Sequence, residues 1–184
     1  MIIYIHGFSS HGLGAKANAF REYFKSVGEP FIAPSLSYIP ELAIETLAEL
    51  IHSYDTVHLI GSSLGGFYAL YLAQRYHLKA ILINPSISPH ITLKRVLGET
   101  THFFDLSHFE WNEQHLRMLQ KYEVSITDER NFLLLLQKGD DLLNYKEALA
   151  KLPKAQQIVE EGGSHSFDGI ERYFDKSLNF FRDL

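Results

Sequence analysis

The chain has 184 residues, with 17 Lys+Arg against 22 Asp+Glu, a formal net charge of −5 and no cysteine. This length suits one domain that buries most of its unfolded surface, and a hydrophobic content of 46% excludes intrinsic disorder. The lack of cysteine excludes a disulfide framework, a thiolate zinc site and a cysteine nucleophile, and the mild acidity without a Lys/Arg cluster argues against a nucleic-acid partner.

Short apolar runs alternate with helical patterns along the chain. In order, the patterns predict strand 2–6, helix 14–27, strand 31–34, helix 40–52, strand 56–61, helix 64–76, strand 79–83, helix 112–122, strands 132–137 and 155–160, and helix 168–182. Parallel strands need crossover connections, so this alternation predicts an α/β fold with a parallel six-stranded sheet and helices on both faces. Strands that are apolar throughout indicate the same buried sheet.

One long segment, residues 86–130, interrupts this alternation and shows no clear strand. It holds the aromatic residues Phe103, Phe104, Phe109 and Trp111. Connections of this length are usually functional, so we expect a cap-like insertion over the carboxyl ends of the strands, within a single domain of residues 1–184. An ordinary excursion whose aromatic side chains pack onto the body is an equally compatible interpretation.

Residues 61–65, Gly-Ser-Ser-Leu-Gly, match the G-x-S-x-G pattern between an expected strand and an expected helix. This is the setting of a nucleophile elbow, a strained turn that brings the strand and helix backbones close together. The residues two before and two after the nucleophile must therefore be small. For Ser63 they are Gly61 and Gly65, whereas for Ser62 they would be large and apolar, so Ser63 is the candidate nucleophile.

A serine nucleophile needs a general base, and ten histidines compete for that role. His165 lies in a polar, glycine-rich loop between the last strand and the last helix, and it comes late in the chain, as the Ser…Asp/Glu…His order requires. His6 follows the first strand, and we interpret it as structural, with catalysis as a minor alternative. His165 is therefore the candidate base.

The remaining parts of such a site follow two other strands. Asp140 and Asp141 come directly after Gly139 at the end of strand 132–137, and either carboxylate could orient the base; spacing does not separate them. An oxyanion hole needs the N–H of the residue after the nucleophile, Leu64, and a second N–H from the loop after an early strand. Phe8 is the candidate for that second donor.

Metal and cofactor signals are weak. The side chains of His102, Asp105, His108 and His115 match no metal-site spacing, and we interpret them as solvated residues of the insertion. The segment 12–14, Gly-Leu-Gly, lacks the third glycine and the acidic partner of a dinucleotide fingerprint. We therefore expect no cofactor and no metal.

Several of these motifs resemble the α/β-hydrolase superfamily, and more closely the small bacterial YqiA-type esterases: residues 6–8, 61–66, 84–85, 139–140 and 161–167. The resemblance runs from residue 2 to about residue 182. It implies a serine esterase or thioesterase with a Ser63–Asp140–His165 triad, no cofactor, and a six-stranded sheet ordered 2-1-3-4-5-6. It favours Asp140 as the acid, because one polar and two apolar residues follow it.

The function expected from the sequence is hydrolysis of a small-molecule acyl ester or thioester through an acyl-serine intermediate. Acyl transfer or amide hydrolysis by the same triad, and a non-catalytic binding protein on this fold, are the alternatives. No apolar run approaches the roughly 20 residues of a membrane span. The first six residues carry no basic or cleavable leader pattern, so we expect a cytoplasmic protein.

Overall fold

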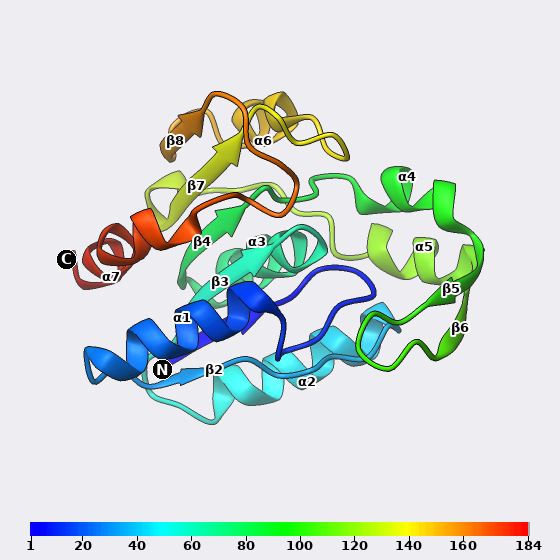
Figure 1. Cartoon of the computed structure of the whole chain (residues 1–184), viewed down its shortest axis with the longest axis horizontal. Coiled ribbons are helices and arrows are strands. Elements are labelled where there is room, and N and C mark those ends of the chain that lie inside the picture. Colours follow the sequence, from blue (N-terminus) through cyan, green and yellow to red (C-terminus); the bar gives the residue numbers. More distant parts are fainter. Residues whose placement is uncertain (184) are drawn as a thin grey trace.

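The computed structural model describes residues 1–183 and centres on a six-stranded sheet with helices on both faces (Figure 1). Its strands are β1 (Ile2–Ile5), β2 (Phe31–Ile32), β3 (His58–Ser62), β4 (Lys79–Ile83), β7 (Phe132–Gln137) and β8 (Gln156–Glu160). They follow the order β2-β1-β3-β4-β7-β8, and every neighbouring pair is parallel. The predicted parallel sheet and its strand order are confirmed.

Both faces of the sheet are buried under helices. Helices α1 (Ala15–Ser26) and α7 (Phe174–Arg182) cover one face, and α2 (Pro40–His52), α3 (Leu64–Tyr76) and α6 (Tyr145–Lys151) cover the other. Successive side chains of a strand point to opposite faces, so Ile2 packs with α1 and α7 while Ile3 packs with α2 and α3. This two-sided burial explains the continuous apolar runs of the strands.

No helix within residues 1–183 combines the length and the apolar character needed to cross a bilayer. The longest, α2 and α3, have 13 residues each. At 1.5 Å per residue each spans about 20 Å, less than the roughly 30 Å of a bilayer's hydrocarbon core.

The segment between β4 and β7 is more regular than the sequence indicates. It contains α4 (Pro89–Thr92), the 3-10 helix η1 (Leu93–Val96), the antiparallel pair β5 (Gly98–Thr101) and β6 (His108–Trp111), and helix α5 (Glu113–Gln120). The expectation that it holds no strand is wrong. In β6, Phe109 and Trp111 are buried while His108 and Glu110 are exposed, a two-residue period that the sequence does carry.

The aromatic side chains of this segment divide between the body and the surface. The Trp111 ring lies edge-on to Phe8, with centroids 4.8 Å apart, and Phe109 also contacts Phe8. Phe103 and Phe104 are 68% and 60% exposed. The second strand of the segment thus contacts the loop after β1 through Phe109 and Trp111. The hairpin tip is also held to this loop: the N–H of Phe103 donates to the carbonyl of Ser9 at 2.9 Å, and the Phe104 ring lies edge-on to His11.

The last helix begins later than residue 168. A 3-10 turn, η3 (Ile170–Tyr173), precedes α7, which starts at Phe174. Phe167 and Gly169 have positive φ angles of 64° and 71°, and the backbone of Asp168 is bound by a side chain of β7. A helix cannot include these conformations, so it begins only after them. Helix α6 and the short 3-10 turn η2 (Glu129–Asn131) are also absent from the predicted elements.

The glycines around the β3–α3 turn allow a very close approach of backbone segments. A Cβ atom on Gly65 would lie 2.6 Å from the carbonyl oxygen of His6 and closer still to that of Ile5. A Cβ on Gly61 would lie 2.8 Å from the Cβ of Ala69. Only glycine fits at these two positions, because the nearby backbone atoms cannot rotate away as a flexible side chain can.

We therefore expect Gly65→Val to destabilise the fold by at least about 3 kcal/mol, because helix α3 could no longer approach β1. Gly14→Val is the matched control: a Cβ there meets nothing closer than 3.5 Å, and its backbone is extended. Urea unfolding of the two variants gives the comparison. Equal unfolding free energies for both would contradict the close-approach explanation.

Candidate active site

Ser63 lies on the sharp turn between β3 and α3 and has an unusual backbone conformation. Its φ and ψ are 56° and −121°, a region that costs a non-glycine residue on the order of 1–3 kcal/mol. Backbone hydrogen bonds hold it there: its N–H donates to the carbonyl of Ile83 at 3.1 Å, and its carbonyl accepts the N–H groups of Gly66 at 2.9 Å and Ser86 at 3.0 Å. Ser63 is partly exposed, whereas Ser62 is 4% exposed. The strained turn presents Ser63 as the accessible hydroxyl.

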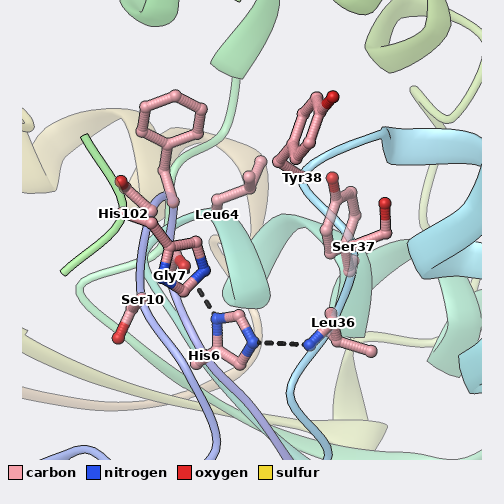
Figure 2. A pocket seen from close by; sticks show the side chains of 11 residues that line it. His6, Gly7, Ser10, Leu36, Ser37, Tyr38, Leu64 and His102 are labelled. Carbon is pink, nitrogen blue, oxygen red and sulfur yellow. Dashed lines mark hydrogen bonds between the residues drawn. The ribbon is translucent and has the colours of Figure 1, made fainter. Parts of the chain in front are cut away.

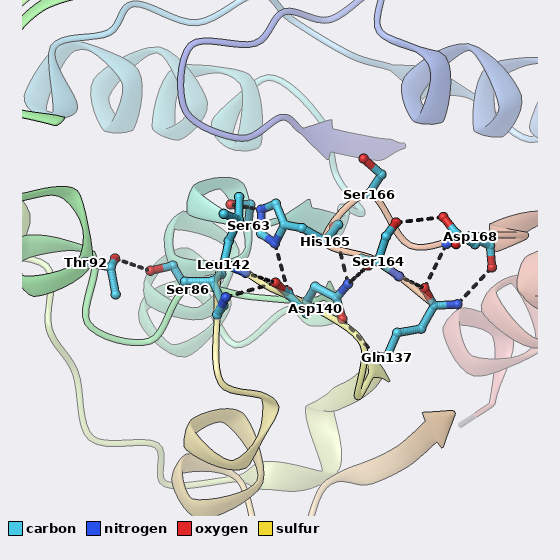
Figure 3. A network of polar contacts seen from close by, with 12 residues as sticks. Ser63, Ser86, Thr92, Gln137, Asp140, Leu142, Ser164, His165, Ser166 and Asp168 are labelled. Carbon is cyan, nitrogen blue, oxygen red and sulfur yellow. Dashed lines mark hydrogen bonds and ion pairs between the residues drawn. The ribbon is translucent and has the colours of Figure 1, made fainter. Parts of the chain in front are cut away.

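Three of the residues singled out in the sequence meet in one chain of hydrogen bonds (Figure 3). His165 Nε2 lies 3.0 Å from Ser63 Oγ, and His165 Nδ1 lies 2.8 Å from Asp140 Oδ2. The Asp140 side chain is 2% exposed and that of His165 is 23% exposed. Residues separated by up to 102 positions in sequence are therefore joined at the carboxyl ends of β3, β7 and β8.

The surroundings of Asp140 favour its ionised form. Burial alone would raise the pKa of this carboxyl, but hydrogen bonds from His165 and from the N–H groups of Leu143 and Leu142 outweigh it and hold the pKa below its usual range. Both N–H groups donate to Oδ1 at 2.9 Å. Asp141, by contrast, is exposed.

The ionised Asp140 determines which nitrogen of His165 carries the proton. A carboxylate can only accept, so Nδ1 must donate to it. In the neutral imidazole, Nε2 is then unprotonated and faces the Ser63 hydroxyl. The arrangement can accept the proton of Ser63 and stabilise the resulting positive charge on the ring.

The two backbone donors expected from the sequence lie beside Ser63. Leu64 is the first residue of α3, so its N–H has no partner within the helix and lies at the positive end of the helix dipole. Within residues 1–183, the N–H groups of Phe8 and Leu64 donate to no protein acceptor. A Cβ on Gly7 would lie 3.2 Å from the Cβ of Ser63, so the loop after β1 is in contact with the serine.

His6 holds that loop in place (Figure 2). Its Nε2 accepts the N–H of Leu36 at 2.9 Å, so Nδ1 is left to donate to the Gly7 carbonyl, also at 2.9 Å. Burial is the main cause that lowers the pKa of His6, which favours the neutral ring. Both ring nitrogens are thus used by backbone groups, which fits the structural interpretation of His6.

Figure 2 also shows a small pocket lined by His6, Gly7, Leu64 and the turn that carries Leu36 and Tyr38. Its volume is about 20 Å³, enough for about one water molecule. Room for a substrate lies elsewhere, in a cavity of about 880 Å³ whose wall includes Ser63 and His165. The body and the segment between β4 and β7 both contribute to that wall.

Two buried amide side chains, Asn84 and Gln137, position the loop that carries His165, and the sequence analysis assigned a role to neither. Gln137 Oε1 accepts the N–H groups of Ser164 and Asp168 at 3.1 and 2.8 Å. Asn84 Nδ2 donates to the carbonyls of Ser164 and His165 at 2.9 and 3.3 Å, and its Oδ1 accepts the N–H of Gln137. Gln137 is 2% exposed and Asn84 is 3% exposed. A glutamine ending an otherwise apolar buried strand is a signal that could have been found, because buried amides need partners.

Gln137→Leu should therefore lower the free energy of unfolding by about 2 kcal/mol or more, since two partly buried N–H groups would lose their acceptor at about 1 kcal/mol or more each. Gln156→Leu, at an exposed position of β8, is the control and should change little. Urea unfolding measures the stability, and amide hydrogen exchange should become faster at residues 164–168. Unchanged exchange in that loop would contradict the positioning role of Gln137.

The histidines of the insertion are not all solvated. His115 is 7% exposed, its ring stacks on Trp111, and its Nδ1 accepts the N–H of Asn112 in a helix-capping arrangement. The interpretation of His115 as a solvated residue is wrong, because it caps and packs the start of α5. Within residues 1–183, no group of three or more His, Asp or Glu side chains is arranged to hold a metal ion.

Known proteins resemble this chain in sequence and in structure. A UPF0227 protein of Vibrio cholerae is 23% identical over 187 residues, covering 98% of each chain. The structure of mouse alpha/beta hydrolase domain-containing protein 10 superposes with a TM-score of 0.79 at 19% identity, covering 98% of this chain and 89% of that one. Est1E of Butyrivibrio proteoclasticus, solved with ferulic acid bound, gives 0.76 at 14% identity, covering 99% and 89%.

These structural likenesses show an α/β-hydrolase fold, as the resemblance of the motifs implied. The sequence model of the uncharacterised protein family UPF0227 matches residues 1–182. That match spans nearly the whole chain, and the protein belongs to the UPF0227 family.

Proposed function

We propose that this protein is a serine hydrolase that cleaves a carboxylic ester or an acyl thioester. The observation that carries the proposal is the hydrogen-bonded chain from Ser63 through His165 to Asp140, at the wall of a cavity of about 880 Å³. In this proposal the chain is one domain, and the insertion 86–130 supplies part of the cavity wall. The likeness to solved structures gives the fold, and the geometry of the three side chains supplies the chemistry.

In the acylation step, Ser63 Oγ attacks the carbonyl carbon of the substrate while its proton passes to His165 Nε2. The carbonyl oxygen becomes an oxyanion, which the N–H groups of Phe8 and Leu64 stabilise. The bond to the leaving alcohol or thiol then breaks, and that group takes the proton from Nε2. An acyl group remains bound to Ser63.

In the deacylation step, water attacks the acyl carbon and gives its proton to His165 Nε2. The second tetrahedral intermediate expels Ser63 Oγ, which recovers the proton, and a carboxylic acid is released. Asp140 remains ionised throughout and stabilises the imidazolium that forms in each step. The two half-reactions need no cofactor, because every proton moves between Ser63, His165, water and the leaving group.

The proposal is tested with p-nitrophenyl esters and acyl-CoA thioesters of graded chain length. Hydrolysis by the wild-type protein, lost in Ser63→Ala, supports it. Release of acyl product only when an alcohol or amine acceptor is added would indicate acyl transfer instead. The absence of turnover in correctly folded protein would favour a binding function.

A single protonation should block the reaction at low pH, because Ser63 can pass its proton only to an unprotonated Nε2. Asp140 contributes no second ionisation in the neutral range, since its pKa is held below the usual value near 4. The measurement is kcat/KM for one uncharged ester between pH 5 and 9, and its logarithm should rise with a slope of about one before it levels. A slope of two on the acid limb would mean that a second protonation also blocks the reaction.

A further inference from the structure

The cavity next to Ser63 is lined by cationic but not by anionic side chains. Its wall contains Lys16 and Arg95, and among residues 1–183 no Asp or Glu lines it. The chain as a whole has the opposite balance, with 22 acidic and 17 basic residues. The charged side chains in the wall of this cavity are therefore positive, whereas the net charge of the whole chain is negative.

Lys16 brings its charge close to the proposed catalytic histidine. It lies in the first turn of α1, and its Nζ donates to the carbonyl of Ser166 at 2.6 Å, one residue after His165. No carboxylate within residues 1–183 forms an ion pair with it, although an ammonium has three donors. Burial lowers the pKa of Lys16 to about 8, against the opposing influence of Asp140 and Asp168, so the ammonium is mostly protonated at pH 7.

Arg95 comes from the other part of the cavity wall. It lies in η1, within the segment between β4 and β7, and is exposed. It has no ion-pair partner within residues 1–183. A guanidinium can bind a carboxylate or a phosphate through two parallel hydrogen bonds. Much of the remaining wall is apolar, including Phe8, Leu93 and Val96.

We propose that this cavity selects esters or thioesters that carry a negatively charged group, a carboxylate or a phosphate, which Lys16 and Arg95 bind while the apolar wall contacts the hydrocarbon part. This substrate class rests on the proposed function for the bond that is cleaved. The negatively charged group can belong to the acyl chain or to the leaving group. In both cases Lys16 and Arg95 would bind it in the same way.

Two matched substrate pairs measure this selectivity. The first pair is p-nitrophenyl hexanoate and mono-p-nitrophenyl adipate, which places a carboxylate at the end of the acyl chain. The second is hexanoyl-pantetheine and hexanoyl-4′-phosphopantetheine, which places a phosphate on the leaving group. We expect kcat/KM at pH 7 to favour the anionic member of at least one pair by about tenfold or more.

The variants Lys16→Met and Arg95→Met should each reduce that anionic-to-neutral ratio by about tenfold. Lys25→Met on α1 and Lys94→Met on η1 are the controls: both residues are exposed and neither lines the cavity, so the ratio should be unchanged. A wild-type ratio at or below one for both pairs would overturn the inference. So would an equal change of ratio in the cavity variants and in their controls.

Binding to the Ser63→Ala protein separates this inference from the proposed hydrolysis. Calorimetry at pH 7 compares the intact anionic and neutral members of each pair. If the wild-type protein hydrolyses nothing but Ser63→Ala binds the anionic member about tenfold more tightly, the anion site stands and the hydrolase proposal fails. Equal binding of both members would overturn the anion site, whatever the wild-type protein hydrolyses.

Discussion

Replacing Ser63 with alanine should lower kcat by a factor on the order of 10⁶ and leave the fold intact, the scale of loss seen when a serine nucleophile is removed. Alanine lacks the oxygen that attacks the carbonyl carbon, yet it keeps the Cβ atom and meets the same backbone constraints at φ 56°. Ester hydrolysis under saturating substrate gives kcat, and circular dichroism with thermal unfolding reports the fold.

Ser62→Ala is the matched control on the adjacent residue. Ser62 ends β3 and is 4% exposed, so its hydroxyl is part of the interior rather than of the hydrogen-bonded chain with His165. Its removal should keep kcat within about tenfold of the wild-type value, since it affects only the hydrogen bond between the Ser62 hydroxyl and the Tyr4 side chain. If Ser62→Ala were inactive and Ser63→Ala active, the assignment of the nucleophile from the glycine spacing would be wrong.

Asp140→Asn should lower kcat by about 10⁴-fold, the scale that follows when the acid of such a triad becomes an amide. The amide oxygen can still accept the N–H groups of Leu142 and Leu143. Its NH₂ group would then face His165 Nδ1 and force the proton onto Nε2, where it blocks transfer from Ser63. The measurement is kcat for one activated ester, together with thermal unfolding.

Asp141→Asn provides the control for charge and position. Asp141 is exposed, so its field at the imidazole is weak and screened by salt, and kcat should change by less than about twofold. A large loss in Asp141→Asn with normal activity in Asp140→Asn would transfer the role of the acid to Asp141. Normal activity in both variants would mean that neither aspartate orients His165.

The regular parts of the fold were predictable because they depend on short-range patterns. Continuous apolar runs and helical periodicities located all six strands of the main sheet, and the glycine spacing around Ser63 placed the turn between β3 and α3. The hairpin of β5 and β6 was missed, although Phe109 and Trp111 alternate with polar residues. The alternating pattern of β6 covers only four residues, which is too short to show a clear period within a polar segment.

The residues that position the site were harder to find, because their partners are distant in sequence. Asn84 contacts a loop 80 positions away, and Gln137 contacts the same loop. The Gln137 side chain supports His165 only because β7 and β8 are neighbours, which no local pattern reveals. The same is true of Lys16, whose Nζ reaches Ser166 across 150 positions.

Labelling with a fluorophosphonate tests the central claim most directly, because this probe reacts with a serine only when a base activates it and an oxyanion site receives the phosphoryl oxygen. Mass spectrometry of peptides from the labelled wild-type protein should locate one adduct on Ser63, and His165→Ala should label far more slowly. Folded wild-type protein that stays unlabelled, or that carries its adduct on another serine, would contradict the account.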